Sequence, residues 1–292
     1  MVLLVIGGDS LLGNALGKHF RVRGFDVILT TRRSSTVAGN RIFLDLARAD
    51  ETEITDLKPT VTLLCAAVSE FKTCDEAPNL AEKVNVAGTL SIARRAHAHG
   101  SKVILFSTNA VFDGQTCPPR EWSRYSPSTQ YGRTKALVEQ GVLDLGERAS
   151  VLRLTKVMSA NVPIVALWYE SLLKGLPITP YSDFRFSPIT LDRVTEAVDC
   201  VLSRDVSGAF HVSGKGVTTY AEFAAMLADY LGFAPDLVRP VVSRAMETVL
   251  PFNPIYPNLG METTMRRLRM EPQPIAEVVR LVARELQLCN RN

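Results

Sequence analysis

The strongest constraint on the fold lies at the start of the chain, where a short apolar run meets a glycine-rich segment. Residues 2–6 are apolar, Gly7-Gly8-Asp9-Ser10-Leu11-Leu12-Gly13 follows, and a helical pattern continues through Leu16 and Phe20. Strand, glycine turn and helix form the opening of a dinucleotide-binding unit. Residues without a Cβ let the backbone approach a pyrophosphate, whose charge rests on the amides and the positive end of the helix. Ser10 stands where the middle glycine is expected, so an ordinary strand-to-helix turn is the alternative.

The second predicted strand carries information about the cofactor. It covers residues 25–30 and ends at Thr31-Arg32-Arg33. An Asp or Glu near this strand end binds the ribose hydroxyls in NAD-preferring units, whereas arginine can grip the 2'-phosphate of NADP. Arg32 and Arg33 therefore favour NADP, with NAD as the alternative. The alternative is that the two arginines are solvated side chains on a loop and bind no ligand.

Strands and helices go on alternating through the first half of the chain. Strands are predicted at residues 41–44, 60–65, 102–106 and 151–154, and helices at residues 79–99 and from about 128 to 147. Each right-handed crossover between parallel strands needs its own helix, so this order predicts an α/β fold with a doubly wound parallel sheet. Ligands bind beyond the carboxyl ends of such strands. Ala66 and Ala67 there leave room for a nicotinamide ribose, and Thr108 offers a hydroxyl that could otherwise be a helix cap.

The segment Tyr131-Gly132-Arg133-Thr134-Lys135 lies on the last of these helices. Residues four apart share one helix face, so the phenol of Tyr131 and the ammonium of Lys135 can stand side by side. A free phenol titrates near pH ~10, and a neighbouring cation lowers that pKa. The pair is therefore a candidate proton donor, with an ordinary pair on a helix surface as the alternative.

Beyond residue 157 the alternation loosens. Helices are predicted at residues 162–174, 192–203, 219–231 and 275–286, separated by proline-punctuated segments. We predict that residues 1–157 form the dinucleotide-binding domain, to which the chain returns at about residues 189–206. Residues 158–292 are predicted to be mostly a smaller substrate-binding lobe.

Composition and charge exclude several classes of protein. The 292 residues carry a net charge of +3 with 22% charged side chains, and no run of Lys or Arg exceeds two. We therefore expect no nucleic-acid or membrane partner. The start of the chain lacks the basic region of a signal peptide, so a cytoplasmic location is expected. The five cysteines never form Cys-x-x-Cys, which argues against a metal site.

These segments together resemble the extended short-chain dehydrogenase/reductase superfamily, and within it the dTDP-4-dehydrorhamnose reductase-like branch, over almost the whole chain. The matching segments are residues 7–13, Cys74-Asp75-Glu76-Ala77-Pro78, Val84-Asn85-Val86-Ala87-Gly88-Thr89, Phe106-Ser107-Thr108-Asn109-Ala110-Val111-Phe112-Asp113-Gly114, Glu121 and residues 131–135. The most specific is Ser-Thr-x-x-Val-Phe-Asp-Gly upstream of Tyr-Gly-x-Thr-Lys. The resemblance implies a Rossmann-type, NADP-dependent oxidoreductase acting on the keto group of a nucleotide-linked sugar, in carbohydrate biosynthesis.

The resemblance also implies roles for individual residues. Tyr131 would donate a proton to the carbonyl oxygen as hydride arrives from the nicotinamide, Lys135 would lower the tyrosine pKa and bind the nicotinamide ribose, and Thr108 would hold the reacting oxygen. The implied cofactor contacts are Gly7, Ser10, Leu11, Leu12 and Gly13 around the pyrophosphate, Arg32 with Arg33 at the 2'-phosphate, Asp45 and Leu46 at the adenine, Ala66 and Ala67, and Tyr131 and Lys135 themselves.

Three departures from the branch concern the substrate. The branch usually has Asp-Tyr where this chain has Asn109 and Ala110, and commonly a tryptophan where this chain has Lys156. These changes enlarge the predicted sugar pocket and make it cationic. Lys156 and Arg185 are then candidate contacts for a carboxylate or phosphate of the substrate, with solvated surface cations as the alternative.

Other functions begin from the same residues. A nucleotide-sugar epimerase or dehydratase would use the same Tyr, Lys and nicotinamide. A non-catalytic NADP-binding regulatory subunit is the alternative from another class, as in methionine adenosyltransferase, whose regulatory subunit belongs to this branch. The expected partner is a nucleotide-sugar substrate, and a homodimer is the oligomeric state considered.

Overall fold

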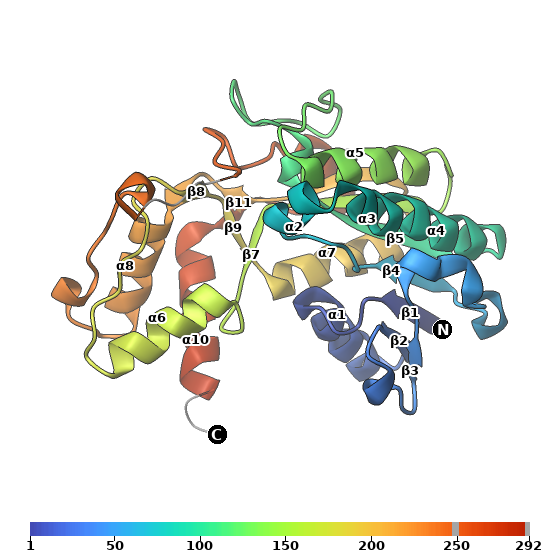
Figure 1. Cartoon of the computed structure of the whole chain (residues 1–292), viewed down its shortest axis with the longest axis horizontal. Coiled ribbons are helices and arrows are strands. Elements are labelled where there is room, and N and C mark those ends of the chain that lie inside the picture. Colours follow the sequence, from blue (N-terminus) through green and yellow to red (C-terminus); the bar gives the residue numbers. More distant parts are fainter. Residues whose placement is uncertain (247–250, 290–292) are drawn as a thin grey trace.

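The computed structural model describes residues 1–246 and 251–289, and the main feature of this part of the chain is a seven-stranded parallel sheet (Figure 1). The strands lie in the order β10-β6-β5-β4-β1-β2-β3. They are β1 (Val2–Ile6), β2 (Asp26–Thr31), β3 (Arg41–Phe43), β4 (Val61–Leu64), β5 (Lys102–Thr108), β6 (Ala149–Leu154) and β10 (Gly208–Val212). The predicted doubly wound α/β fold is confirmed.

The order of the strands reverses in the middle of the sheet. From β1 the chain moves outward through β2 and β3, and it then returns to the other side of β1 with β4, β5 and β6. At such a switch point the loops after neighbouring strands diverge to opposite faces and leave a crevice at the carboxyl ends, where ligands bind. The fold therefore places the loops after β1 and β4 beside one another at a ligand site.

Helices cover both faces of the sheet, as the almost wholly apolar strands require. The helices of this part are α1 (Leu11–Val22), α2 (Phe71–Glu76), α3 (Pro78–Glu82), α4 (Thr89–Ala98), α5 (Gln130–Leu143), α7 (Leu191–Ser203) and α9 (Glu262–Leu268). Phe20 of α1 and Val198 of α7 share one hydrophobic core with the sheet. Ile92 of α4 and Val138 of α5 belong to a second core. The sheet is thus shielded on both sides, and only its ends remain open to a ligand.

The helix predicted over residues 79–99 is not continuous. The chain forms α3, a π-helical segment at Lys83–Gly88 and then α4. Gly88 approaches the segment after β3 so closely that a Cβ would lie 1.9 Å from the carbonyl oxygen of Leu46. This contact fixes Leu46, one of the predicted adenine contacts, against the helix.

Three local features differ from the sequence-based expectation. Helix α2 and strand β10 were not predicted, and β10 carries a polar His211 among its apolar residues. Helix α5 ends at Leu143 rather than near residue 147, since Gly146 turns the chain with a φ of 75°. Strand β10 matters most, because it extends the sheet beyond β6.

The remaining elements form a smaller body beside the carboxyl ends of the sheet (Figure 1). They are α6 (Pro163–Leu173), α8 (Tyr220–Tyr230) and α10 (Ile275–Cys289), with the short strands β7 (Lys156–Met158), β8 (Arg185–Phe186), β9 (Pro188–Thr190), β11 (Gly214–Lys215), β12 (Thr218–Thr219) and β13 (Gln273–Pro274). Trp168, Phe223 and Val282 share a separate core there. The exact division into domains stays a prediction.

Short 3-10 helices complete the described part of the chain, at Ser34–Thr36, Leu46–Glu51, Thr55–Leu57, Asn109–Val111, Pro235–Leu237 and Ser243–Met246. Over residues 1–246 and 251–289, no helix combines the length and the apolar character that a membrane span requires.

Candidate active site

A cavity of about 1240 Å³ lies at the carboxyl ends of the strands, between the sheet and the smaller body. Most of the predicted site residues line it: Gly7, Ser10, Leu12, Arg32, Arg33, Asp45, Leu46, Ala66, Ala67, Thr108, Asn109, Tyr131, Lys135, Lys156 and Arg185. Three of them do not, namely Leu11, Gly13 and Ala110. Leu11 is exposed, whereas Gly13 and Ala110 are buried behind the cavity wall. One cavity thus joins the predicted nucleotide contacts to the predicted catalytic residues.

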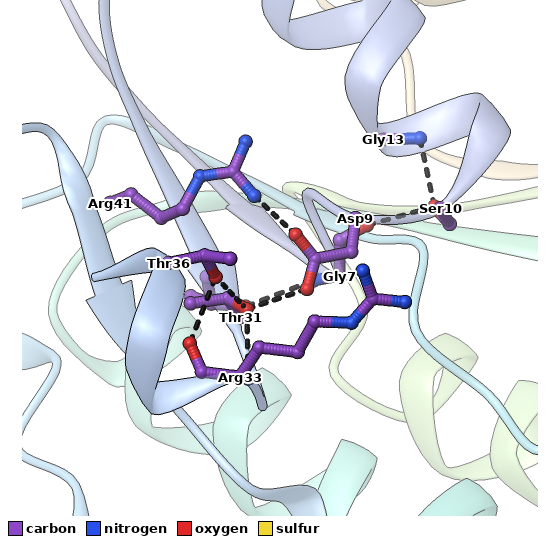
Figure 2. Close-up of polar contacts among 9 residues, drawn as sticks. Gly7, Asp9, Ser10, Gly13, Thr31, Arg33, Thr36 and Arg41 are labelled. Atoms are coloured by element: carbon purple, nitrogen blue, oxygen red, sulfur yellow. Dashed lines mark hydrogen bonds and ion pairs between the residues drawn. The ribbon is translucent and has the colours of Figure 1, made fainter. Parts of the chain in front are cut away.

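The glycine-rich turn is closed by Ser10, the residue that replaces the expected middle glycine. The Ser10 hydroxyl accepts a hydrogen bond from the N–H of Gly13 at 3.0 Å and donates one to the carbonyl oxygen of Gly7 at 2.8 Å (Figure 2). It is thereby the N-cap of α1, a position that serine favours. A Cβ on Gly13 would lie 2.2 Å from the Gly7 carbonyl oxygen, so the turn needs glycine there.

Next to this turn lies a charged cluster to which sequence reasoning gave no role. Asp9 forms an ion pair with Arg41, at the start of β3, and accepts a hydrogen bond from the Thr31 hydroxyl at 2.5 Å (Figure 2). The Thr31 hydroxyl in turn accepts one from the backbone N–H of Arg33 at 2.9 Å. The sequence signal was an acidic residue inside the glycine-rich turn, but only the fold shows that it meets the end of β2.

Lys135 is the most deeply buried charged group of the cavity. Its side chain leaves α5 toward β5, and Nζ donates a hydrogen bond to the carbonyl oxygen of Phe106 at 2.7 Å. Only 3% of the residue is exposed. Burial lowers the pKa of Lys135 to about 8, although the Glu139 carboxylate opposes that shift. The lysine therefore changes charge close to neutral pH.

Tyr131 lies one turn before Lys135 and faces the same cavity. It is half-buried, with its ring edge-on to Phe71 at 5.6 Å between ring centroids. Burial raises the pKa of the Tyr131 phenol, and the negative charge of Glu139 adds to the effect. This is opposite to the lowering expected from Lys135, whose ammonium donates its hydrogen bond to the Phe106 carbonyl oxygen. The protein's own groups therefore keep the phenol protonated.

Thr108 is the last residue of β5, and its register partner on the neighbouring strand β6 is Leu154. Its hydroxyl accepts a hydrogen bond from the backbone N–H of Ala110 at 3.1 Å, and its contact with the Asn109 side-chain oxygen is long, at 3.4 Å. The hydroxyl proton thus stays available to another acceptor. The Asn109 amide donates to the carbonyl oxygen of Pro257 at 2.8 Å, which ties this corner to the carboxyl-terminal part of the chain.

A fully buried charge cluster supports α5 from behind, and sequence reasoning did not find it. Arg153 of β6 pairs with Glu139 of α5 at 2.8 Å, and no more than 2% of either side chain is exposed. The Arg153 guanidinium also donates to the Tyr125 hydroxyl at 3.0 Å and to the Glu121 carbonyl oxygen at 2.9 Å. A glutamate four residues after Lys135 and an arginine within an apolar strand were the available signals.

Two further cations face the cavity from the smaller body. Lys156 follows β6 and is exposed toward the cavity, yet the surrounding protein lowers the pKa of its ammonium. Arg185 of β8 is exposed and lines the cavity together with its neighbour Phe186, whose ring packs edge-on against Tyr220. Across residues 1–246 and 251–289, no carboxylate lies within ion-pair distance of Lys156.

The chain is similar along nearly its whole length to one protein family, whose model, described as RmlD substrate binding domain, matches residues 1–288. Methionine adenosyltransferase 2 subunit beta of Xenopus tropicalis is 27% identical over 263 residues, which are 86% of this chain and 78% of that protein. The dTDP-4-keto-6-deoxy-D-glucose reductase of Streptomyces niveus is 27% identical over 246 residues, 82% of each chain. A solved structure of dTDP-4-dehydrorhamnose reductase from Bacillus anthracis, in complex with NADP, matches with a TM-score of 0.84 at 19% identity and covers 96% of each chain.

Proposed function

The chain belongs to the RmlD substrate binding domain family, and from this premise we propose that it is an NADP-dependent reductase of the keto group of a nucleotide-linked sugar. The observation that carries the proposal is one cavity with two chemically different ends. Exposed Arg32 and Arg33 line one end, and Thr108, Tyr131 and the buried Lys135 line the other.

The nucleotide end fits a dinucleotide by its shape and charge. Gly7 is packed so tightly that a Cβ would lie 2.8 Å from Ala66, which leaves backbone and small side chains where a pyrophosphate has to approach. Arg32 and Arg33 form no ion pair with the described residues, so both guanidinium groups are available to a 2'-phosphate. NADP is therefore the favoured cofactor, and NAD is the alternative.

The reacting end supplies a proton and a place for the oxygen that receives it. When bound, the nicotinamide supplies hydride to the carbonyl carbon. The Tyr131 phenol donates its proton to the carbonyl oxygen, and its raised pKa keeps that proton in place beforehand. The Thr108 hydroxyl, which already accepts from Ala110, donates to the same oxygen. The Lys135 ammonium, fixed by the Phe106 carbonyl, places a positive charge beside the developing alkoxide.

The substrate end favours an anionic sugar nucleotide. Lys156 lies two residues beyond Leu154, the strand partner of Thr108, and so stands near the reacting oxygen. Lys156 and Arg185 form no ion pair with the described residues, so both are candidates for the carboxylate or phosphate of the substrate.

A reductase is distinguished from an epimerase or dehydratase by its net consumption of NADPH. Purified protein should be mixed with NADPH and a panel of 4-keto nucleotide sugars while NADPH absorbance and product masses are followed. The proposal predicts oxidation of NADPH with at least one member, and loss of that oxidation in Tyr131→Phe. Conversion of a sugar without net NADPH loss would instead identify an epimerase or dehydratase.

A non-catalytic subunit is the second candidate, and a specific observation favours it. Several curated relatives, including the Xenopus tropicalis protein, are named as a beta subunit of methionine adenosyltransferase 2. The same panel assay, combined with a titration of NADPH binding, tests it, because tight NADPH binding without turnover of any panel member would support the subunit over the reductase. The buried Lys135 beside Tyr131 and Thr108 argues for catalysis.

A further inference from the structure

The carboxylate at the ribose end of the dinucleotide site comes here from an unusual place in the sequence. In NAD-preferring units an acidic residue near the end of the second strand binds the ribose hydroxyls. This chain has Thr31 and Arg32 at that strand end, but Asp9 from the glycine-rich turn reaches it and accepts a hydrogen bond from Thr31 at 2.5 Å. The fold thus restores an acid at the ribose position that the second strand itself lacks.

Arg41 neutralises this acid. Asp9 and Arg41 form an ion pair in which 27% of each side chain is exposed, so the pair is partly shielded from water but still reachable. Asp9, Thr31 and Arg33 line the cavity. Figure 2 shows the Arg33 side chain extending from the end of β2 toward the turn that carries Asp9. One carboxylate therefore stands among several cations where a ribose 2'-substituent would lie.

We propose that the Asp9–Arg41 pair sets the preference between NADPH and NADH, a role that rests on the proposed nicotinamide cofactor. A 2'-phosphate is repelled by Asp9 and attracted by Arg41, whereas a 2'-hydroxyl can donate a hydrogen bond to Asp9 and gains nothing from Arg41. The two residues therefore act in opposite directions on the ratio of the two affinities. Thr31 is a positioning residue, because it holds the Asp9 carboxylate at the strand end.

The test measures dissociation constants of NADPH and NADH by equilibrium fluorescence titration of the full chain. Asp9→Asn should strengthen NADPH relative to NADH by roughly five- to tenfold, which corresponds to one pair of unit charges about 4 Å apart with the full screening of water. Arg41→Gln should shift the ratio by a similar factor toward NADH, because it leaves Asp9 uncompensated. Arg41→Lys keeps the charge and should keep the wild-type ratio.

Matched controls separate this effect from a general loss of structure. Arg23→Gln breaks another Asp–Arg pair, with Asp199 of α7 at 2.5 Å, at the carboxyl end of α1 and outside the cavity lining, and should leave both affinities unchanged. If Asp9→Asn does not fold, Thr31→Val tests the same carboxylate by releasing it, and should also move the ratio toward NADPH.

The outcomes distinguish the two proposals. Equal changes for both cofactors in Asp9→Asn and Arg41→Gln would overturn the selector and leave the reductase intact. Wild-type protein that binds neither nicotinamide dinucleotide would overturn both. Opposite shifts in the two variants, with Arg41→Lys and Arg23→Gln like wild type, would establish the pair as the selector.

Discussion

The two ends of the cavity handle charge in opposite ways. At the nucleotide end the charged groups are partly or fully exposed, and the Asp9–Arg41 pair keeps 27% of each side chain accessible. At the reacting end Lys135 is 3% exposed, and the Glu139–Arg153 pair behind it is no more than 2% exposed. A binding end needs charges that can change partners as a ligand enters, whereas a reacting end needs fixed charges with little surrounding water. Four predictions probe this contrast.

The largest effect is expected for Tyr131→Phe, which removes the proposed proton donor. Turnover of the keto substrate should fall by about 10²- to 10⁴-fold, because general acid catalysis contributes that much. The affinity for NADPH should change little, because most of the proposed cofactor contacts lie at the other end. Steady-state kinetics and cofactor titration on the same preparation check both statements. The exposed Tyr230→Phe is the control, and a matching loss of NADPH binding in Tyr131→Phe would show that the two ends are not separate.

Arg153→Met should strongly destabilise the protein, because it leaves the Glu139 carboxylate buried without its partner. Removing one member of a buried ion pair typically costs about 3–5 kcal/mol of unfolding free energy. Chemical denaturation measures the loss. Lys72→Gln breaks an exposed pair with Glu76 and should cost no more than about 0.5 kcal/mol. Similar losses in both variants would remove the distinction between buried and exposed charges.

Lys156→Met should weaken substrate binding without removing the chemistry. Loss of a charge-assisted hydrogen bond costs about 1.5–3 kcal/mol, so KM should rise roughly ten- to hundredfold while kcat changes less. Kinetics with an anionic keto sugar nucleotide measure the effect, and the exposed Lys174→Met is the control. An unchanged KM would mean that Lys156 only faces solvent.

The smallest predicted effect is a pH dependence from Lys135. Its pKa is lowered to about 8, so the side chain is cationic below that pH and neutral above it. If the cation is required, kcat/KM for reduction is constant below about pH 8 and falls by up to about tenfold per unit above it. A rate profile between pH 6 and pH ~10 measures this. A flat profile across that range would exclude a requirement for the Lys135 charge.

Much of the fold was predictable because its signals are local. Apolar runs, helical periodicity and the glycine turn identified six of the strands in the sheet, since each element buries its own residues in a regular pattern. Strand β10 was missed because it includes the polar His211 and lies in the sheet by pairing with β6. Its existence depends on tertiary contacts that no window of sequence contains.

The candidate site shows the same distinction between local sequence signals and tertiary contacts. Thr108, Tyr131 and Lys135 could be predicted as one site because they lie in one recognisable motif set, and all three line the cavity. The Asp9–Arg41 and Glu139–Arg153 pairs were missed because each joins residues brought together only by the sheet order. The direction of the Tyr131 pKa shift was wrong for a related reason, since burial is a property of the folded chain.

The central claim is that this protein transfers hydride from NADPH to a keto sugar nucleotide. The most direct measurement supplies NADPH in which both hydrogens of the reactive nicotinamide carbon are replaced by deuterium. The mass of the sugar product is then measured by mass spectrometry. The account predicts one deuterium in each product molecule and one NADPH oxidised for each product formed. Tight binding of NADPH with no deuterium in any sugar of the panel would contradict it.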